Sequence, residues 1–370
     1  MTVVGTRPEI IRLSRIIPKL DQYFEHTLVH TGQNYDYELN EIFFDQLALR
    51  KPDIVLDVAA QTSALTIAQV IAKTDEVFAE YSPDALLLLG DTNSVLCAIS
   101  AKRRKIPIFH MEAGNRCFDF RVPEEINRRI VDHISDINLP YSAIARQYLI
   151  AEGIAADQVI KTGSPMREVL DFYAPQIAAS TILKTLELKS NQYFVVSAHR
   201  EENVDTAQNL NQLVSLLNLL ATEYRLPIIL STHPRTRARL EALASPLDPL
   251  VKPMKPFGFF DYVALQQEAR CVLSDSGTIT EESSILNFPA LNIRQAQERP
   301  EGFEEGAVML VGTNPERVLQ ALALLKEQPR NQARSLAMVG DYAATNVSDK
   351  VIRIILSYID FVKQRTWKQI

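Results

Sequence analysis

Two acidic residues that follow apolar runs are the side chains best suited to chemistry in this chain. Asp91 comes directly after one run, and Glu112 comes shortly after the next. A third acid is expected from Pro123-Glu124-Glu125, where the proline suits a first helical turn. The two glutamates either complement the helix dipole or place one carboxylate in a site. Because clustered carboxylates raise one another's pKa, the set can supply an acid and a base near neutral pH.

A second group of residues is typical of phosphate binding. Ser276-Gly277-Thr278 follows an apolar run and begins a helical pattern. Backbone N–H groups at such a helix N-terminus bind phosphate, and Glu282 is placed to accept hydrogen bonds from ribose hydroxyls. The alternative is an ordinary capped helix with exposed glutamates. Arg7 and His199-Arg200 are further candidate contacts of a diphosphate.

Polar motifs follow seven of the predicted strands, and two of them add further candidate ligand contacts, Arg116 and His233. Any one such motif is explained equally well by turn chemistry or by a helix cap. Seven motifs at the same edge of two parallel sheets favour a shared binding site. The chain has no His-x-x-His or Cys-x-x-Cys spacing, so we expect neither a tightly bound metal nor a cofactor.

Short apolar runs alternate with amphipathic stretches along the whole chain, as in parallel α/β proteins. The predicted strands are Thr2–Val4, His26–His30, Ala85–Leu89, Ile106–His110, Ile137–Leu139, Tyr193–Ser197, Pro227–Ser231, Leu250–Pro253, Cys271–Ser274 and Ala290–Ile293. The clearest predicted helices are Glu9–Tyr23, Ala64–Tyr81 and Asn209–Thr222. The sequence therefore predicts two Rossmann-like domains whose sheets face a central cleft.

The helix that begins at Pro123 and the last helix carry apolar residues at helical spacing. Val122, Ile126, Ile130 and Ile134 recur every four residues and predict a buried stripe. Ser348 is the expected N-cap of the last helix. With a turn cluster near Thr162–Pro165, the expected domains are 1–165 plus 350–370, and 166–349.

The amino-acid composition argues against a nucleic-acid-binding protein and against a membrane-spanning one. The 370 residues include 39 basic and 45 acidic side chains, a net charge of −6, so no basic excess favours nucleic-acid binding. No apolar run approaches the roughly 18 residues of a membrane span. The 3 cysteines are widely spaced and form no disulfide framework, which favours the reducing cytoplasm.

Taken in order, the motifs resemble those of the non-hydrolysing UDP-N-acetylglucosamine 2-epimerases over nearly the whole chain. The matching segments are Gly5-Thr6-Arg7-Pro8-Glu9, His30-Thr31-Gly32-Gln33, Gly90-Asp91-Thr92-Asn93-Ser94, Glu112-Ala113-Gly114, Pro123-Glu124-Glu125 with Asn127-Arg128, His199-Arg200-Glu201, Asp275-Ser276-Gly277 with Glu281-Glu282, and Arg299-Pro300-Glu301. The resemblance implies a GT-B fold whose last helix returns to the first domain, and a homodimer. It also implies elimination of UDP to a glycal and its re-addition with inverted C2.

The resemblance also implies roles for individual residues. Asp91, Glu112 and Glu124 correspond to acid/base carboxylates on the sugar-binding first domain. The second domain is implied to bind UDP. The residues implied to contact UDP or to close on the sugar are His199 beside the diphosphate, Arg7 and Ser276-Gly277 on the diphosphate, Glu282 on the ribose, Pro256 and Phe257 on uracil, and Arg294 and Arg299 on the closing loop.

Two departures from the family pattern bear on the substrate. Asn34 replaces a histidine found in many members, in the region where a second substrate molecule activates some of them. Asn115 replaces a leucine of the N-acetylglucosamine branch, and the connection 115–122 differs in length and composition. This version resembles the branch that converts UDP-2-acetamido-2,6-dideoxy-L-talose to UDP-N-acetyl-L-fucosamine for capsule or O-antigen synthesis. The alternative within the family is the epimerisation of UDP-N-acetylglucosamine.

Three other classes of function remain open on the sequence. A GT-B glycosyltransferase would share the nucleotide site but needs only one base in its acceptor half. A catalytically dead sensor of nucleotide sugars would tolerate loss of Asp91 or Glu112, and both are present. A hydrolysing epimerase would release free sugar, so a product that still carries UDP excludes it.

Overall fold

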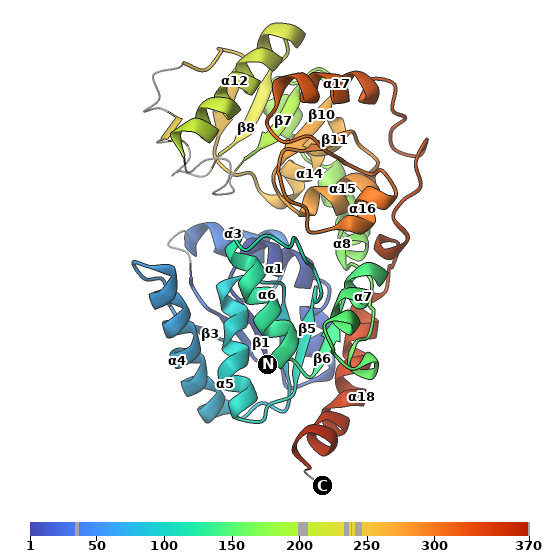
Figure 1. Ribbon diagram of the computed structural model, residues 1–370. Helices are drawn as coiled ribbons and strands as arrows, with labels where there is room; N and C mark the ends of the chain where they lie inside the picture. Colours follow the sequence, from blue (N-terminus) through green and yellow to red (C-terminus); the bar gives the residue numbers. More distant parts are fainter. Residues whose placement is uncertain (34–36, 199–205, 233–236, 238, 241–245, 369–370) are drawn as a thin grey trace. The chain divides into compact units, whose positions relative to one another are not determined.

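The computed structural model describes residues 1–33, 37–198, 206–232, 237, 239–240 and 246–368. The chain divides into two compact units, which are described separately below. The N-terminal unit is formed by Met1–Asp171 and Asp341–Ile370, and the C-terminal unit by Phe172–Gly340. Figure 1 shows a sheet between helices in each unit. The assignment of a sugar side to one unit and a UDP side to the other stays a prediction.

The N-terminal unit is built on a six-stranded sheet in which every recorded strand pair is parallel. Its strands, in spatial order, are β3 (Ile54–Val55), β2 (Leu28–His30), β1 (Thr2–Val4), β4 (Leu86–Leu89), β5 (Ile108–Met111) and β6 (Ile137–Leu139). Its helices are α1 (Arg7–Leu13), α2 (Ile17–Tyr23), α3 (Tyr37–Gln46), α4 (Ser63–Tyr81), α5 (Ala98–Arg103), α6 (Pro123–Ile134), α7 (Ala143–Ala151) and α18 (Val347–Trp367), with short 3₁₀ turns at Asn93–Cys97, Ala156–Gln158 and Gly340–Tyr342.

The C-terminal unit repeats this arrangement with a second six-stranded parallel sheet. Its strands, in spatial order, are β12 (Met309–Leu310), β11 (Ala290–Asn292), β10 (Cys271–Ser274), β7 (Phe194–Ser197), β8 (Ile228–Ser231) and β9 (Val251–Met254). Its helices are α9 (Ala174–Ala178), α10 (Ile182–Thr185), α12 (Ala207–Tyr224), α14 (Phe259–Glu268), α15 (Thr278–Leu286), α16 (Pro300–Glu304) and α17 (Pro315–Leu325), and α8 (Met166–Phe172) spans the boundary between the units.

The strand order in each sheet reverses near its middle. In the N-terminal sheet the chain moves outward from β1 to β3 and then returns to the other side of β1 with β4. Loops that follow the two strands at such a reversal diverge, and open α/β sheets bind ligands there. The predicted α/β class with two parallel sheets is therefore confirmed, and the loops after β1 and β4 are neighbours.

Continuous apolar runs form the inner strands because both faces of each sheet are covered by helices. In the N-terminal unit, α4, α5 and α6 contribute Phe78, Ala98 and Val131 to the core on one face of the sheet. Every strand predicted from the sequence is present. The two strands that were not predicted, β3 and β12, are two-residue edge strands, too short to give a pattern.

Two helix predictions are wrong in detail. The predicted helix Glu9–Tyr23 is two helices, because Pro18 lies in the first turn of α2 and has no N–H to donate to the preceding turn. Ser348 is not the N-cap of α18, since Asn346 precedes the helix. The Ser348 amide and hydroxyl instead donate to Glu168, which ties the helix to α8.

The last helix belongs to the N-terminal unit, as the resemblance implied. Charged side chains along α18 pair with residues from separate parts of that unit: Asp349 with Lys19, Lys363 with Asp84 at 2.9 Å, and Arg365 with Asp157. Trp367 lies beneath the Lys102 ammonium, 5.3 Å from ring centroid to nitrogen. Exposed ion pairs contribute little to stability, so the buried apolar side chains of α18 hold it in place.

Substitutions at adjacent positions of α18 test this account. Ile355 is 4% exposed, whereas Leu356 is 69% exposed. We expect Ile355→Ala to lower the free energy of unfolding by about 2–5 kcal/mol, because it leaves a cavity. Leu356→Ala should change it by less than about 0.5 kcal/mol. Urea unfolding followed by circular dichroism measures both, and equal losses would contradict the packing described.

Candidate active site

The buried carboxylate of Glu9 joins the loop after β1 to the loop after β4. It accepts hydrogen bonds from the Gly5 and Thr6 amides at one end of α1. It also accepts from the Thr92 hydroxyl, at 2.5 Å, and from Ser94, at 3.2 Å. Burial raises the pKa of Glu9 to about 7, although these donors favour the carboxylate. Sequence reasoning did not select Glu9, because a capping role accounts for a glutamate at that position.

Arg7 lies in the first turn of α1, beside the loop that Glu9 fixes. Its guanidinium carbon is 5.6 Å from the centroid of the Phe43 ring, in a cation–π contact. Gly5 leaves no room for a side chain, since a Cβ there would lie 2.4 Å from the Thr31 hydroxyl. Close packing of this turn therefore fixes the start of α1 and the side chain that it carries.

Asp91 is held by two residues of α6. Its Oδ2 lies 2.7 Å from Arg128 Nη2, and its side chain is 21% exposed. The Asn127 amide donates to the Asp91 carbonyl at 3.0 Å and to the Asn93 side chain at 3.1 Å. The loop after β4 is thus fixed through its backbone, while part of the Asp91 carboxylate is accessible.

Glu112 lies at the end of β5 in an unusual backbone conformation. Its φ is +63°, in the left-handed region that costs free energy for a residue with a side chain. Its carboxylate forms a buried ion pair with Arg12 of α1, and the Asn115 amide donates to it at 3.3 Å. Such strain concentrates where a side chain is held for function, which supports Glu112 as a site residue.

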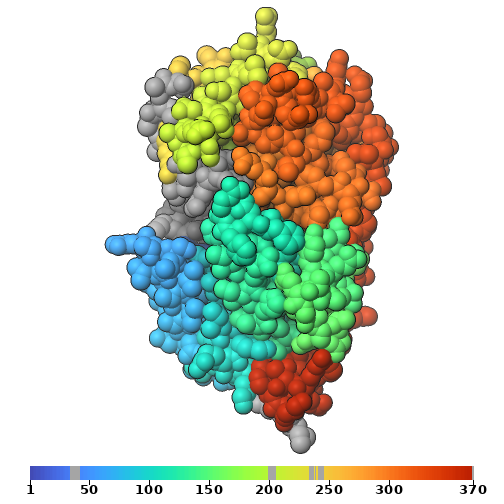
Figure 2. All heavy atoms as spheres, in the orientation of Figure 1, coloured from blue at the N-terminus to red at the C-terminus, as the bar shows by residue number. Residues whose placement is uncertain are grey.

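The buried face of α6 differs from the predicted one. Of the predicted stripe, Val122 is buried and Ile134 packs against the core. Ile126 and Ile130 are exposed at 48% and 37%, so these two do not belong to a buried stripe. Glu125, Arg128 and Asp132 are buried instead. The reason is that α6 covers the loops after β4 and β5, whose polar groups need polar partners. Figure 2 shows the segment containing α6 at the viewed surface of the N-terminal unit.

The structure separates the two adjacent glutamates at the start of α6. Glu125 is fully buried and accepts from the Cys117 amide at 3.1 Å, from Arg128 at 3.2 Å and from Arg129 at 3.0 Å. Glu124 is half-buried. Glu125 therefore holds the connection before α6 in place, and Glu124 is the one of the pair with an accessible carboxylate.

Asp132 of α6 is the centre of a buried polar network. It accepts from His110 Nδ1 at 2.9 Å, from the Gly114 amide at 3.1 Å and from Arg116 Nη1 at 2.6 Å. The other ring nitrogen of His110 lies 2.7 Å from the Gly90 carbonyl oxygen. Gly90 directly precedes Asp91, and Gly114 lies two residues after Glu112. The network thus reaches both segments that carry candidate catalytic acids.

Arg116 was expected to contact the substrate, and its geometry favours a structural role. The side chain is fully buried. Its Nε and Nη2 donate to Glu152 at 2.8 and 2.6 Å, and its Nη1 donates to Asp132 and to the Asn115 carbonyl. Because each nitrogen of the guanidinium donates to a protein acceptor, Arg116 holds the segment after Glu112.

In the C-terminal unit, the N-terminus of α15 has the features of an anion site. Gly277 is its N-cap, and Ser276 and Thr278 are half-buried with their hydroxyls 3.0 Å apart. The Ser276 amide donates to Ser274 at the end of β10. The helix N-terminus therefore lies at the carboxyl end of a central strand, where a phosphate is expected to bind.

Three further predicted residues of this unit, Glu282, Arg294 and Arg299, have charged or polar partners. Glu282 is buried and accepts from Gln266 at 2.7 Å. Arg294 pairs with Glu298 at 2.9 Å, and Arg299 lies 3.3 Å from the carboxylate of Glu281. These pairs fix the loop between β11 and α16 against α15.

Three predicted residues, His199, Arg200 and His233, lie outside the described residues, as does Asn34. Pro256 and Phe257 lie in the connection between β9 and α14, and both are half-buried. Phe257 packs against the core beneath α14. Their role in holding uracil stays a prediction.

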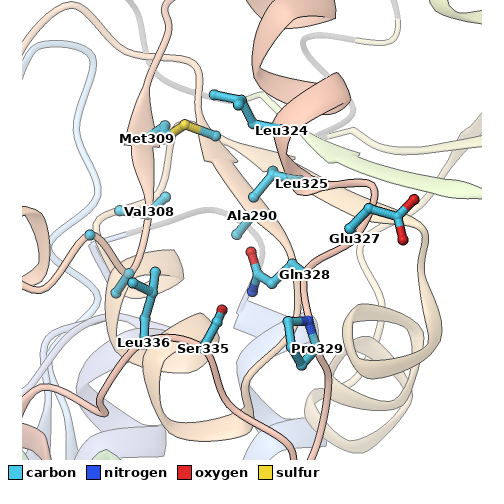
Figure 3. A pocket seen from close by; sticks show the side chains of 12 residues that line it. Ala290, Val308, Met309, Leu324, Leu325, Glu327, Gln328, Pro329, Ser335 and Leu336 are labelled. Carbon is cyan, nitrogen blue, oxygen red and sulfur yellow. The ribbon is translucent and has the colours of Figure 1, made fainter.

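A cavity of about 300 Å³ lies elsewhere in the C-terminal unit. Figure 3 shows mainly apolar side chains around it, with Glu327, Gln328 and Ser335 as polar exceptions. Ala290 and Met309, the first residues of β11 and β12, contribute to its wall. Since these are the amino ends of the strands, the cavity is at the wrong edge of the sheet for the predicted site.

Among the described residues, no group of three or more His, Cys, Asp and Glu side chains is placed to hold a metal ion. The same part of the chain contains no helix long and apolar enough to cross a membrane.

Sequence reasoning missed Arg12, Glu9, His110 and Asp132. A signal was present for one of them: Glu125, Arg128 and Asp132 recur at helical spacing on one face of α6. The apolar periodicity of the isoleucines, which normally marks the buried face of a helix, predicted a different face.

Comparisons with known proteins extend this description. The family model described as UDP-N-acetylglucosamine 2-epimerase matches residues 18–356. The solved structure of UDP-N-acetylglucosamine 2-epimerase from Rickettsia bellii is 53% identical, with a TM-score of 0.93, and covers 100% of this chain and 99% of its own. The enzyme from Methanocaldococcus jannaschii, solved in complex with UDP-GlcNAc and UDP, is 30% identical, with a TM-score of 0.88 and coverage of 96% and 99%.

A curated relative acts on a different sugar. The UDP-2,3-diacetamido-2,3-dideoxy-D-glucuronate 2-epimerase of Pseudomonas aeruginosa is 34% identical over 327 residues, which are 87% of this chain and 90% of the relative.

The fold and the site define an α/β enzyme of the GT-B-like class that acts on nucleotide sugars. The chain belongs to the UDP-N-acetylglucosamine 2-epimerase family. It is an isomerase, a non-hydrolysing UDP-sugar 2-epimerase.

The raised pKa of Glu9 predicts a dependence of stability on pH. Its pKa is about 7 in the folded chain, against an ordinary value of 4.5 for a glutamate. Between these values the unfolded chain loses the proton and the folded chain keeps it, so the contribution of Glu9 to stability falls as pH rises through this window. We expect Glu9→Gln to be less destabilising, relative to wild type, at about pH 8 than at about pH 5.

Urea unfolding at the two pH values measures this difference, with the exposed Glu80→Gln as the control. The free-energy change caused by Glu80→Gln should be the same at both. A Glu9→Gln effect that is constant with pH, or larger at the higher pH, would contradict the assignment.

Proposed function

We propose that the chain epimerises C2 of UDP-2-acetamido-2,6-dideoxy-L-talose to give UDP-N-acetyl-L-fucosamine. The observation that carries this choice is the contact between Asn115 and Glu112, at 3.3 Å. Asn115 is the position where the sequence departs from the N-acetylglucosamine branch. A residue that distinguishes the branches therefore touches a carboxylate proposed to act on the sugar.

The proposed reaction removes the proton at C2 and eliminates UDP to leave a glycal. Re-addition of UDP, with a proton delivered to the opposite face of C2, gives the epimer. Asp91, Glu112 and Glu124 are the proposed acid and base groups. Their placement supports the proposal, since α6 contacts the segments that carry Asp91 and Glu112 and itself carries Glu124.

The proposed UDP contacts are of two kinds. Ser276 and Gly277 at the N-terminus of α15 would hold the diphosphate through backbone N–H groups, and Arg7 would add a positive charge. The carboxylate of the buried Glu282, which accepts a hydrogen bond from Gln266, would also accept hydrogen bonds from the ribose hydroxyls. Roles for His199, Arg200, His233, Pro256, Phe257, Arg294 and Arg299 follow from the family resemblance alone.

The second candidate function is epimerisation of UDP-N-acetylglucosamine. It is supported by the description of the matching family and by the M. jannaschii structure with UDP-GlcNAc and UDP. The P. aeruginosa relative supports variation of the sugar within the family. A homodimer, a place in capsule or O-antigen synthesis and a cytoplasmic location stay predictions.

The two substrates are distinguished by proton NMR of each reaction in heavy water. We expect kcat/KM to be higher for UDP-2-acetamido-2,6-dideoxy-L-talose, with deuterium at C2 of the product. Slow turnover of UDP-N-acetylglucosamine is compatible with this, because a pocket that merely lacks a partner for a hydroxyl discriminates by about 100-fold.

A higher kcat/KM for UDP-N-acetylglucosamine would refute the L-fucosamine assignment and leave the 2-epimerase assignment standing. Epimerised product with full C2 protium would contradict solvent exchange during elimination. Free sugar and UDP in place of a UDP-sugar product would contradict the non-hydrolysing reaction.

The proposed acid and base groups are tested by Asp91→Asn and Glu112→Gln. Each should lower kcat by about 100-fold or more, as expected for a general acid or base. The affinity for UDP should change far less, because UDP is proposed to bind mainly the C-terminal unit. Glu80→Gln, an exposed acid of the same unit, is the matched control. Wild-type kcat in either variant would remove that residue from the mechanism.

A further inference from the structure

The Asp132 carboxylate of α6 accepts three hydrogen bonds, all from the segment 110–116 at the end of β5 and in the loop after it. Its Oδ1 accepts from the ring of His110 in β5. Its Oδ2 accepts from the guanidinium of Arg116 and from the backbone amide of Gly114. Asp132, His110 and Arg116 all have fully buried side chains. Two positive groups and one backbone dipole therefore compensate the buried charge, as such a charge requires.

His110 extends this network to the segment that carries Asp91. Its Nδ1 faces the Asp132 carboxylate and its Nε2 faces the Gly90 carbonyl oxygen. The Gly90 carbonyl can only accept, so Nε2 donates to it. Although burial opposes its charge, His110 and Arg116 lower the pKa of Asp132, and towards an ionised Asp132 Nδ1 also donates, which makes the ring an imidazolium. Burial opposes this charge, but the bonds to Asp132 and to Gly90 outweigh it and raise the pKa of His110 above its ordinary value.

The segment after β5 tolerates little change. A Cβ on Gly114 would lie 2.4 Å from the Ala145 carbonyl oxygen, and its φ is +82°. The neighbouring Glu112 also has a positive φ. A segment held in such a conformation needs fixed contacts from its surroundings, and the Asp132 carboxylate supplies one directly to the Gly114 amide.

We propose that Asp132 and His110 are positioning residues that fix the Asp91 and Glu112 segments relative to each other for the epimerase reaction. Neither side chain is accessible to substrate, so they act through the backbone at Gly90 and Gly114. The inference deepens the proposed function, because it specifies how two of the proposed acid and base groups are aligned. A displacement of about 1 Å in such groups can cost about 100-fold in rate.

The chain offers a matched control for Asp132. Asp136 is also a buried acid of this unit, 1% exposed. It accepts from Lys102 and from the Ile108 amide at the amino end of β5, at the opposite edge of the sheet from Gly90 and Gly114. Asp136→Asn therefore removes a comparable buried charge without touching the catalytic segments.

The first measurement is steady-state kinetics of Asp132→Asn and Asp136→Asn with both UDP-sugars. We expect Asp132→Asn to lower kcat by about 10- to 100-fold while KM changes by less than about 3-fold, since alignment and not binding is lost. Asp136→Asn should keep kcat within about 3-fold of wild type, although both variants unfold at lower urea concentrations.

The second measurement does not depend on activity. Labelling with ¹⁵N,¹³C-glycine gives signals from only 12 residues. We expect Asp132→Asn to shift the signals of Gly114, which it contacts, and of Gly90, which it reaches only through His110. Asp136→Asn should leave both unchanged. If wild type turns over neither UDP-sugar, the proposed function fails, and the glycine signals alone decide whether the network positions the two segments.

Equal kcat in the two variants, or a Gly90 signal that Asp132→Asn leaves in place, would overturn the proposal. The second variant, His110→Gln, removes the other member of the pair and should lower kcat by a similar factor. If Asp132→Asn and His110→Gln both fail to fold while Asp136→Asn folds, the pair serves stability and the positioning role is wrong.

Discussion

The bond between the Asp132 carboxylate and the His110 ring is the interaction on which the proposed N-terminal site depends. It is buried in the layer between α6 and the end of β5, and it connects α6 to the backbone before Asp91 and after Glu112. A buried ion pair of this kind is weak evidence for stability, because desolvation offsets much of the attraction. Its value here is geometric, since each partner also bonds to a backbone group that borders a candidate catalytic acid.

The same constraint explains why α6 presents apolar side chains to solvent. Glu125, Arg128 and Asp132 all point into the unit, toward the loops after β4 and β5 and the connection before α6. Side chains that face polar loops have to be polar, because the loops would otherwise lose their hydrogen-bond partners. Apolar periodicity therefore misplaced Ile126 and Ile130, although it correctly located the helix, and Ile134 does pack against the core.

Much of the fold could be predicted from the sequence, because continuous apolar runs and the turns between them mark buried parallel strands directly. The edge strands β3 and β12 could not, since two residues carry no pattern. The candidate acids Asp91 and Glu112 could be selected because they lie within two residues of the ends of β4 and β5. Their partners Arg12, Arg128 and His110 could not, because a pairing between distant residues depends on the strand order and leaves no local signal. Arg116 illustrates the same limit, since its strand-end position favoured a ligand contact, whereas its geometry favours a structural role.

The protonation of His110 is the most direct test of the account. Both ring nitrogens are placed to donate, so ¹⁵N NMR of histidine-labelled protein near neutral pH should show the two His110 nitrogens protonated, with slowly exchanging ring protons. The Asp132→Asn variant, which removes the carboxylate acceptor, should lose the Nδ1 proton. A neutral His110 ring with one unprotonated nitrogen in the wild type would contradict the account, because the contact with either Asp132 or the Gly90 carbonyl would then lack its donor.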